Sequence, residues 1–184
     1  GHCQCDNCTK MGSVSTRVFT LVNEVAKTVE EHYPGKYVGC LAYSDHSEPP
    51  DFKLRPNVFV QLTAGFTRGR YTFDQLLDLW PKVVSNFGVY DYLNVWIWTY
   101  DLPGAARGAD TRYLRERIPL FYAKGARTMS CESGSNFGPN GLGYLVASRL
   151  MWNPKADVDA VCRDFYEKAF GPAAAVMQRY YERY

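Results

Sequence analysis

The chain has 184 residues, enough for one compact domain with a hydrophobic core and too few for two full-sized domains. Its 46% hydrophobic and 22% charged residues are ordinary for a globular protein and argue against intrinsic disorder. The formal net charge of +2 gives no electrostatic case for nucleic-acid binding, and no apolar run approaches the roughly 20 residues that span a bilayer. Aromatic residues make up 15% of the chain, a share that suits either a sugar-stacking surface or a dense core.

Hydrophobic periodicity predicts helices and strands that alternate along most of the chain. Ser13 is a candidate N-cap for the first long helix. Thr72 with Gln75 resembles a capping box at the start of the second helix. Pro81 is expected to kink this second helix or to divide it into two short ones. The predicted helices cover about 14–33, 73–87, 111–124, 142–152, 158–170 and 173–184. The predicted strands cover 37–43, 57–63, 93–99 and 126–131.

Strands that alternate with helices pair in parallel through crossover connections, so we predict four parallel strands in sequential order. One face of each strand is apolar and fits under helices, whereas the other becomes polar or aromatic towards the C-terminal end. This second face carries Gly39, Leu41 and Tyr43; Phe59, Gln61 and Thr63; Trp96, Trp98 and Tyr100; and Thr128, Ser130 and Glu132.

The second face resembles the interior of a barrel whose active site lies at the strand C-termini. We therefore predict an α/β fold that forms the C-terminal half of a TIM-type (β/α)8 barrel. Residues 1–184 would be one partial domain, with the first four units of the barrel upstream of Gly1. Antiparallel pairing of 37–43 with 57–63 would contradict the barrel.

Cys3, Cys5 and Cys8 form a C-x-C-x-x-C pattern in a polar, loop-like segment. Three close thiols can hold a structural zinc ion if a fourth ligand such as His2 completes the tetrahedron. The alternatives are a local disulfide with one free thiol, or a loop that packs without metal. In each case we expect the cluster at an exposed rim, and we expect catalysis to require no cofactor. The remaining cysteines are predicted to be buried thiols: Cys40, Cys131 and Cys162.

Four stretches together resemble a known bacterial family: GHCQCDNC, KYVGCLAYSDHSEPP, NVWIWTYDLP and CESGSNFGPNGLGYLVASRLMWNPKADVDAVCRDFYEKAFGPAA. They resemble the domain of unknown function four-eight-three-eight, which is associated with glycoside hydrolase family one hundred and sixty-three, a family of endo-β-N-acetylglucosaminidases. The likeness covers essentially the whole chain. It implies a bacterial carbohydrate-active barrel, a glycan substrate and an exported parent protein. In related barrels the strand expected before Gly1 commonly supplies the general acid, so this chain alone is expected to lack part of the site.

Glu132, at the end of the last predicted strand, is the first candidate for a catalytic carboxylate, and Asp101 is the second. The structural alternatives are a salt bridge at the rim for Glu132 and a loop cap for Asp101. Five residues are predicted to bind or stack against sugar, with solvated loops, core packing or turn formation as their alternatives: Tyr43, Asp45, Trp98, Tyr100 and Asn136. The strand spacing predicts that Tyr100 and Glu132 meet at the mouth of the sheet.

Three functions compete. The first is a fragment of a glycoside hydrolase that acts on N-acetylglucosamine-containing glycans, and the second is a non-catalytic carbohydrate-binding or scaffold domain. The third is a small zinc protein organised by the cysteine cluster. Two site carboxylates about 5 to 9.5 Å apart across a cleft would favour hydrolysis.

Overall fold

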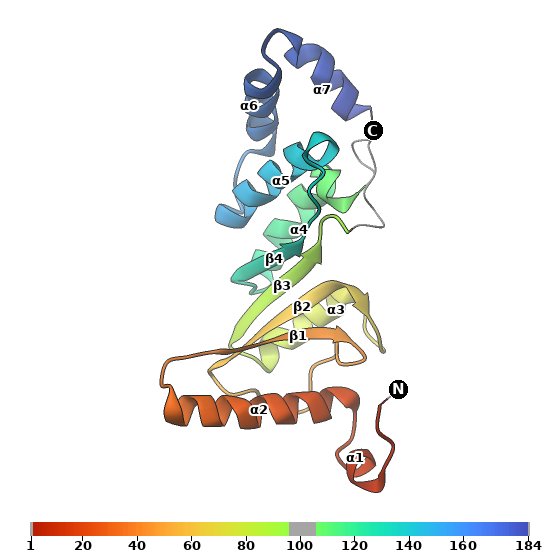
Figure 1. The fold of residues 1–184 in the computed structure, drawn as a ribbon, viewed down its shortest axis with the longest axis vertical. Helices are drawn as coiled ribbons and strands as arrows, with labels where there is room; N and C mark the ends of the chain where they lie inside the picture. The colour runs from red at the N-terminus through yellow and green to blue at the C-terminus, as the bar shows by residue number, and fades with distance from the viewer. Residues whose placement is uncertain (1, 96–105, 184) are drawn as a thin grey trace. The chain divides into compact units, whose positions relative to one another are not determined.

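The computed structural model describes residues 2–95 and 106–183. It shows an α/β protein with a four-stranded parallel sheet in the order β1-β2-β3-β4 (Figure 1). The strands are β1 (Val38–Ser44), β2 (Val58–Thr67), β3 (Asn86–Tyr92) and β4 (Thr128–Glu132). The α-helices are α1 (Asp6–Lys10), α2 (Val14–His32), α3 (Phe73–Leu79), α4 (Thr111–Ala123), α5 (Phe137–Trp152), α6 (Val158–Phe170) and α7 (Ala174–Glu182), with 3-10 turns at η1 (Trp80–Lys82), η3 (Arg107–Ala109) and η4 (Gly171–Ala173).

The chain divides into two compact units. The first unit contains Gly1–Asp91 with Lys124–Ser130, and the second contains Tyr92–Ala123 with Cys131–Tyr184. The division falls within β3 and β4, so the first unit holds most of the sheet and the second holds α4 to α7.

The predicted parallel arrangement of the first two strands is confirmed. Val38 of β1 lies opposite Val58 of β2, and the two strands run parallel although no helix interrupts residues 45–57. The register shifts after Ala42 and Leu62, because the next pair is Ser44 with Thr67, so the extra residues of this irregularity lie in β2. Strands β2 and β3 are also parallel, so the order of strands is that of the sequence.

Helices α2 and α3 begin where the sequence predicts. The Ser13 hydroxyl accepts the backbone N–H of Thr16 at the start of α2. At the start of α3, Thr72 and Gln75 form the reciprocal capping box, in which each side chain accepts the other residue's backbone N–H. Both helices contact β2, and together with the strands they bury the core of the first unit. Its fully buried members include Phe19, Ala26, Val58, Val60, Leu62, Leu76, Leu77 and Trp80.

The sheet has a covered face and an open face. Ala42, Val60 and Leu62 point into the core and have no exposed surface. On the opposite side, Leu41 and Tyr43 remain 38% and 36% exposed. We call the second side the open face and define it by the exposed, half-buried or glycine positions Gly39, Leu41, Tyr43, Phe59, Gln61, Gly88, Thr128 and Ser130. The alternation of faces predicted from the sequence is therefore present in β1 and in the first part of β2, whereas the three central residues of β4 are all half-buried.

Thr63 departs from this alternation. We expected it on the same side as Gln61, but its side chain is fully buried. Its hydroxyl donates a 3.0 Å hydrogen bond to the carbonyl of Ala42 on the neighbouring strand. Thr63 is the first residue of β2 beyond the regular pairing, which ends at Ala42 and Leu62.

The position of the third strand was predicted wrongly. The apolar spacing from Leu76 to Phe87 predicted a helix, and the strand was expected at 93–99. The helix instead ends at Leu79, and η1, with Pro81 at its start, separates it from β3 at Asn86–Tyr92. Val60 and Leu62 of β2 pair with Phe87 and Val89 of β3, and this pairing overrides the weak helical periodicity. Residues 93–95 lie outside any strand, and 96–99 lie outside the described residues.

The second unit is built from packed helices. Helix α5 contacts α4, α6 and η3, and it begins at Phe137, five residues before the predicted start. Its buried side chains join those of α4 in one core: Leu114, Ile118, Phe121, Leu142, Val146, Ala147 and Leu150. Gly143 lets α5 approach η3 closely, because a Cβ at this position would lie 1.4 Å from the carbonyl oxygen of Gly108.

Candidate functional site

A polar contact crosses the open face of the sheet. Gln61 of β2 lies opposite Gly88 of β3, and its Nε2 lies 2.9 Å from the hydroxyl oxygen of Ser130 on β4. The Ser130 hydroxyl also lies 3.2 Å from Gln61 Oε1. Because Gly88 carries no side chain, the two polar groups on β2 and β4 meet above β3. The face that the sequence predicts to be polar therefore carries polar side chains on β2 and β4, with a glycine between them on β3.

The C-terminal edge of β1 and β2 forms a charged pocket of about 460 Å³. We call it the edge pocket, and its lining includes His2, Asp45, Glu48, Arg68 and Arg70. Asp45 follows β1 directly and accepts contacts from two bases: His2 Nε2 at 2.9 Å and Arg68 Nη1 at 3.4 Å. The hydrogen bond from His2, with a smaller contribution from Arg68, lowers the pKa of the Asp45 carboxyl.

Glu48 and Arg70 form the second charged pair of the edge pocket. Arg70 Nη2 lies 3.1 Å from Glu48 Oε2, and the backbone N–H of Arg70 donates to the same carboxylate. The pair raises the pKa of the Arg70 guanidinium, chiefly through its hydrogen bonds to Glu48. Gly69 belongs to this contact as well, since a Cβ there would lie 2.3 Å from Glu48 Oε1. Sequence reasoning placed Asp45 here but missed Glu48, Arg68 and Arg70, which the loops after β1 and β2 bring together.

Asp45 in the edge pocket is poorly suited to proton donation. A general acid needs a carboxyl pKa raised towards the working pH. The pairing of Asp45 with His2 and Arg68 has the opposite effect on its pKa. Ionised carboxylates and guanidinium groups accept and donate hydrogen bonds to hydroxyl-rich ligands.

Strained backbone and exposed aromatic rings lie at this same edge. Ser44 and Phe66 both have positive φ angles, of 51° and 57°, which non-glycine residues rarely adopt. The ring of Phe66 lies 6.2 Å from that of Tyr43, and 52% of Phe66 is exposed. Tyr43, predicted to bind substrate, is therefore half of an exposed aromatic pair whose other member was not predicted.

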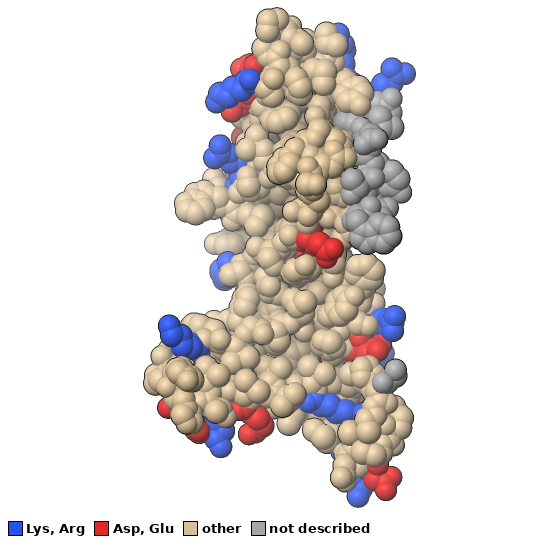
Figure 2. Space-filling model, in the orientation of Figure 1, with Lys and Arg blue, Asp and Glu red and all other residues tan. Residues whose placement is uncertain are grey.

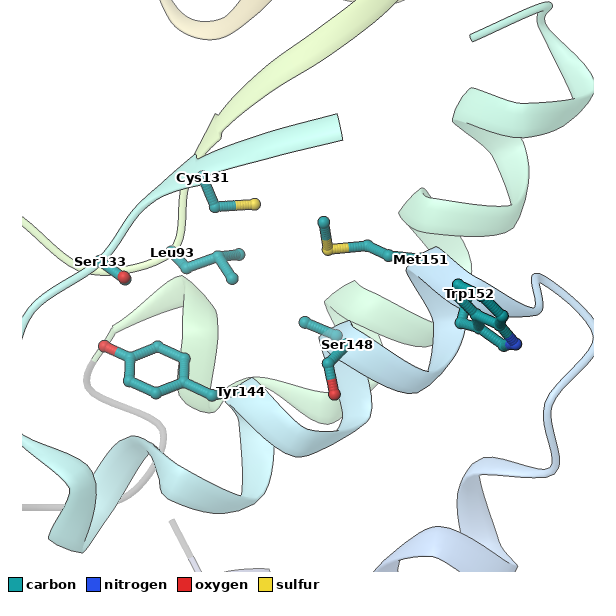
Figure 3. Close-up of a pocket in the computed structure, with 8 residues that line it drawn as sticks. Leu93, Cys131, Ser133, Tyr144, Ser148, Met151 and Trp152 are labelled. Carbon is teal, nitrogen blue, oxygen red and sulfur yellow. The ribbon is translucent and has the colours of Figure 1, made fainter. Parts of the chain in front are cut away.

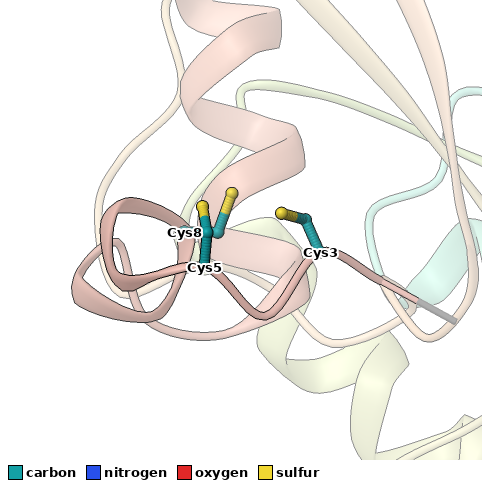
Figure 4. A group of neighbouring side chains, drawn as sticks. All are labelled: Cys3, Cys5 and Cys8. Atoms are coloured by element: carbon teal, nitrogen blue, oxygen red, sulfur yellow. The ribbon is translucent and has the colours of Figure 1, made fainter.

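The three N-terminal cysteines converge in the first unit (Figure 4). The sulfur atoms of Cys3, Cys5 and Cys8 all lie within 4.8 Å of one another. Cys3 and Cys5 are exposed and Cys8 is half-buried, so the cluster is at the surface as expected. Cys5 precedes α1 and Cys8 lies within it, although this segment was expected to be loop-like. His2, considered above as a fourth metal ligand, points to Asp45 instead.

The close approach of the sulfurs shifts the pKa values of Cys5 and Cys8 in opposite directions. The pKa of Cys5 is lowered to about 7 by the backbone N–H of Cys8 and then by the thiols of Cys3 and Cys8. The pKa of Cys8 is raised to about 11, first by Cys3 and then by Cys5. A second negative charge in so small a cluster is unfavourable unless a cation is present. By contrast, burial raises the pKa of Cys40 to about 11 and also raises that of Cys162.

Glu132 lies at the end of β4, where it is exposed. Its backbone carbonyl accepts the N–H groups of Leu93 and Asn94, at 2.9 and 3.2 Å. Asn136 is the N-cap residue of α5 and its carbonyl accepts the side-chain amide of Asn140, so Asn136 contributes to the start of this helix. The other catalytic candidate, Asp101, and the stacking candidates Trp98 and Tyr100 lie outside the described residues.

The second unit contains an apolar pocket of about 440 Å³ near Glu132 in sequence (Figure 3). Cys131 and Ser133 line it, whereas Glu132 between them does not, as expected from side-chain alternation. Tyr144 also lines the pocket, and its hydroxyl donates to the carbonyl of Gly134 at 3.2 Å. At the other end of the lining, Trp152 is 92% exposed. This pocket was not predicted, because its residues come from a strand end and from α5.

Charged groups are dispersed over the surface. On the face drawn in Figure 2, Lys and Arg side chains are scattered and several lie beside acidic ones. Across residues 2–95 and 106–183, none of the helices combines the length and the apolar character needed to cross a bilayer.

The fold and these sites define an α/β protein with a parallel sheet, one open polar face and a charged pocket at the strand C-termini. Residues 1–183 match the model of one family, the domain of unknown function DUF4838, and the chain belongs to that family. The resemblance to this domain family is thereby confirmed. No curated protein and no solved structure matches the chain.

Proposed function

We propose that this chain is part of a carbohydrate-active barrel that binds and cleaves N-acetylglucosamine-containing glycans. Its sheet would be the C-terminal half of a (β/α)8 barrel, with the open face turned inward and the edge pocket at the catalytic end. Parallel sheets normally have both faces covered. Half of a barrel has helices on its outer face only. Its inner face, of mixed polar and aromatic character, is then left uncovered.

The contact between Gln61 and Ser130 carries this proposal. In (β/α)8 barrels the interior is filled in layers, and the side chains of one layer come from alternate strands. Gln61 is on β2 and Ser130 is on β4, and they meet over Gly88 of the intervening strand. An open doubly wound sheet has helices on both faces and does not require this arrangement.

The edge pocket supports a sugar as the ligand. Its carboxylates and guanidinium groups can hydrogen-bond to hydroxyls, and Tyr43 with Phe66 offers an exposed aromatic surface on which a sugar ring can stack. In this proposal Glu132 and Asp101 are the site carboxylates, Trp98 and Tyr100 stack against sugar, and Asn136 contacts a hydroxyl.

The proposal is tested with a fluorescently labelled oligosaccharide that contains N-acetylglucosamine, and with the full-length protein. Glu132→Gln should lower the rate of hydrolysis by about a hundredfold or more while the fold persists, because the substitution preserves shape and removes acidity. Glu116→Gln, which changes an exposed carboxylate on α4, is the matched control and should cleave like the wild type. Normal cleavage by Glu132→Gln would assign Glu132 a structural role.

The non-catalytic alternative predicts a different pair of results. A carbohydrate-binding domain would bind the labelled oligosaccharide, and the wild type would release no product. Asp45→Asn should then weaken binding by about tenfold, since it removes a charged hydrogen-bond acceptor. Asp51→Asn, at an exposed position in the β1–β2 connection, should leave binding unchanged. Neither binding nor cleavage of such glycans by the full-length protein would contradict both functions.

A further inference from the structure

The cysteine cluster at the N-terminus has the geometry of a metal site. In a zinc–thiolate site the Zn–S bonds are about 2.3 Å, so sulfurs in a tetrahedral arrangement lie about 3.8 Å apart. The sulfurs of Cys3, Cys5 and Cys8 already lie within 4.8 Å of one another, and the Cys3 side chain points towards those of Cys5 and Cys8 (Figure 4). A small contraction would therefore bring all three into contact with one ion.

The local fold explains why the sulfurs converge. Cys5 and Cys8 are three residues apart at the beginning of α1, a spacing that puts two side chains on the same side of a helical turn. Cys3 is held by a separate contact, because Arg17 of α2 donates from Nη1 to its carbonyl at 2.8 Å. The Nε of Arg17 also donates to the carbonyl of Gly12 at 3.0 Å, so one guanidinium ties both ends of the segment to α2.

We propose that Cys3, Cys5 and Cys8 bind a zinc ion through three thiolates, with the fourth position taken by a solvent molecule. Each protein–metal bond replaces an S–H proton, which is released to solvent. The ion supplies the positive charge without which three adjacent thiolates repel one another. His2 is left out of the coordination sphere because the ligand atoms that converge are the three sulfurs, and the His2 side chain is at Asp45, with Nε2 2.9 Å from Oδ2.

The ion would also determine how the N-terminal segment meets the edge pocket. His2 is adjacent to Cys3 in the chain, and it is the residue that contacts Asp45 after β1. Fixing Cys3 on a metal limits the freedom of His2 and so favours its contact with Asp45. The zinc site is thus a structural support for the edge pocket, and it stands on the sulfur geometry independently of the proposed sugar chemistry.

The first experiment measures zinc binding to the full-length protein, reduced and metal-free, in competition with a chromophoric chelator. The wild type should bind one additional equivalent compared with the triple variant Cys3→Ser, Cys5→Ser, Cys8→Ser, and each single variant should bind at least about tenfold more weakly than the wild type. Cys162→Ser, which changes a half-buried thiol in the second unit, should match the wild type. Equal zinc binding by the wild type and the triple variant would overturn the proposal.

The second experiment tests the composition of the site with His2→Ala. Under the three-thiolate arrangement this variant retains its zinc, and its cobalt-substituted form keeps the wild-type thiolate-to-metal absorption. Loss of the metal or an altered cobalt spectrum would replace the proposed set of ligands with one that contains His2.

A third experiment uses the wild type alone. Removal of its zinc with a chelator should increase hydrogen exchange at residues 2–9 and leave α2 protected. Unchanged exchange at residues 2–9 would contradict the structural role.

Discussion

Gln61 and Ser130 are hydrogen-bonded partners although their strands are not neighbours. The Gln61 Nε2 to Ser130 Oγ distance is 2.9 Å, and the strand between them contributes Gly88 at the crossing point. The contact thus depends on three residues from three strands. It places one ordered polar contact on the open face of the sheet.

Gly88→Ala should destabilise the protein by about 1–3 kcal/mol, the usual cost of overpacking a filled site. A Cβ at Gly88 would lie 2.2 Å from the hydroxyl oxygen of Thr128 and 2.8 Å from its carbonyl oxygen, so the backbone of β4 would have to move. Chemical denaturation followed by circular dichroism measures the loss. The matched control is Gly39→Ala on the same face of β1, where the nearest atom is 3.9 Å away. Equal stability of the two variants would show that β3 and β4 are less closely packed.

Phe19→Ala should lower the free energy of unfolding by about 3–5 kcal/mol, because it removes a large side chain from a filled core. Phe19 on α2 is fully buried, and its ring meets that of Trp80 at 5.0 Å in an edge-to-face arrangement. Leu21→Ala, on the same helix at a position that is 66% exposed, should change stability by less than about 0.5 kcal/mol. Similar losses for both variants in urea denaturation would argue against the burial of this face of α2.

Thr72→Ala should cost about 1 kcal/mol, since it removes the side-chain acceptor at the start of α3. Thr72→Ser keeps the hydroxyl and should retain most of the stability. The two variants are compared by thermal and chemical unfolding. An equal loss for the serine variant would mean that the methyl group of Thr72, rather than its hydroxyl, is responsible.

The pKa of Asp45 should lie below the ordinary value for an aspartate, and it should rise when His2 is replaced by Ala. The lowered pKa means that the paired carboxylate contributes to stability at neutral pH, and that this contribution is lost as the pH falls through the pKa of the folded state. Side-chain carboxyl NMR during acid titration measures the shift. His32→Ala, at the end of α2, is the control and should leave the Asp45 titration unchanged. An ordinary pKa for Asp45 in the wild type would show that His2 spends little time at this carboxylate.

Local sequence determined the elements whose signals are short-range. The Ser13 cap and the Thr72–Gln75 capping box mark the starts of α2 and α3 without reference to the rest of the chain. Alternation along residues 57–63 identified a strand and, as far as Leu62, its buried side, because every second residue on the buried face is hydrophobic. The parallel order of β2, β3 and β4 also followed from local patterns, since the helices in their connections permit few other arrangements, whereas no helix lies between β1 and β2.

Tertiary structure decided the rest. The segment at 86–92 has an ambiguous pattern, and it becomes β3 because Phe87 and Val89 find partners on β2. The same holds for the sites: Gln61 meets Ser130, and Arg68 meets Asp45, across 69 and 23 residues of chain. Such contacts leave no periodic signal, because a short stretch of sequence does not determine which distant side chain it will meet in the folded protein. The cysteine spacing marked a candidate metal site, whereas the fold brought the three sulfurs within 4.8 Å and turned His2 towards Asp45.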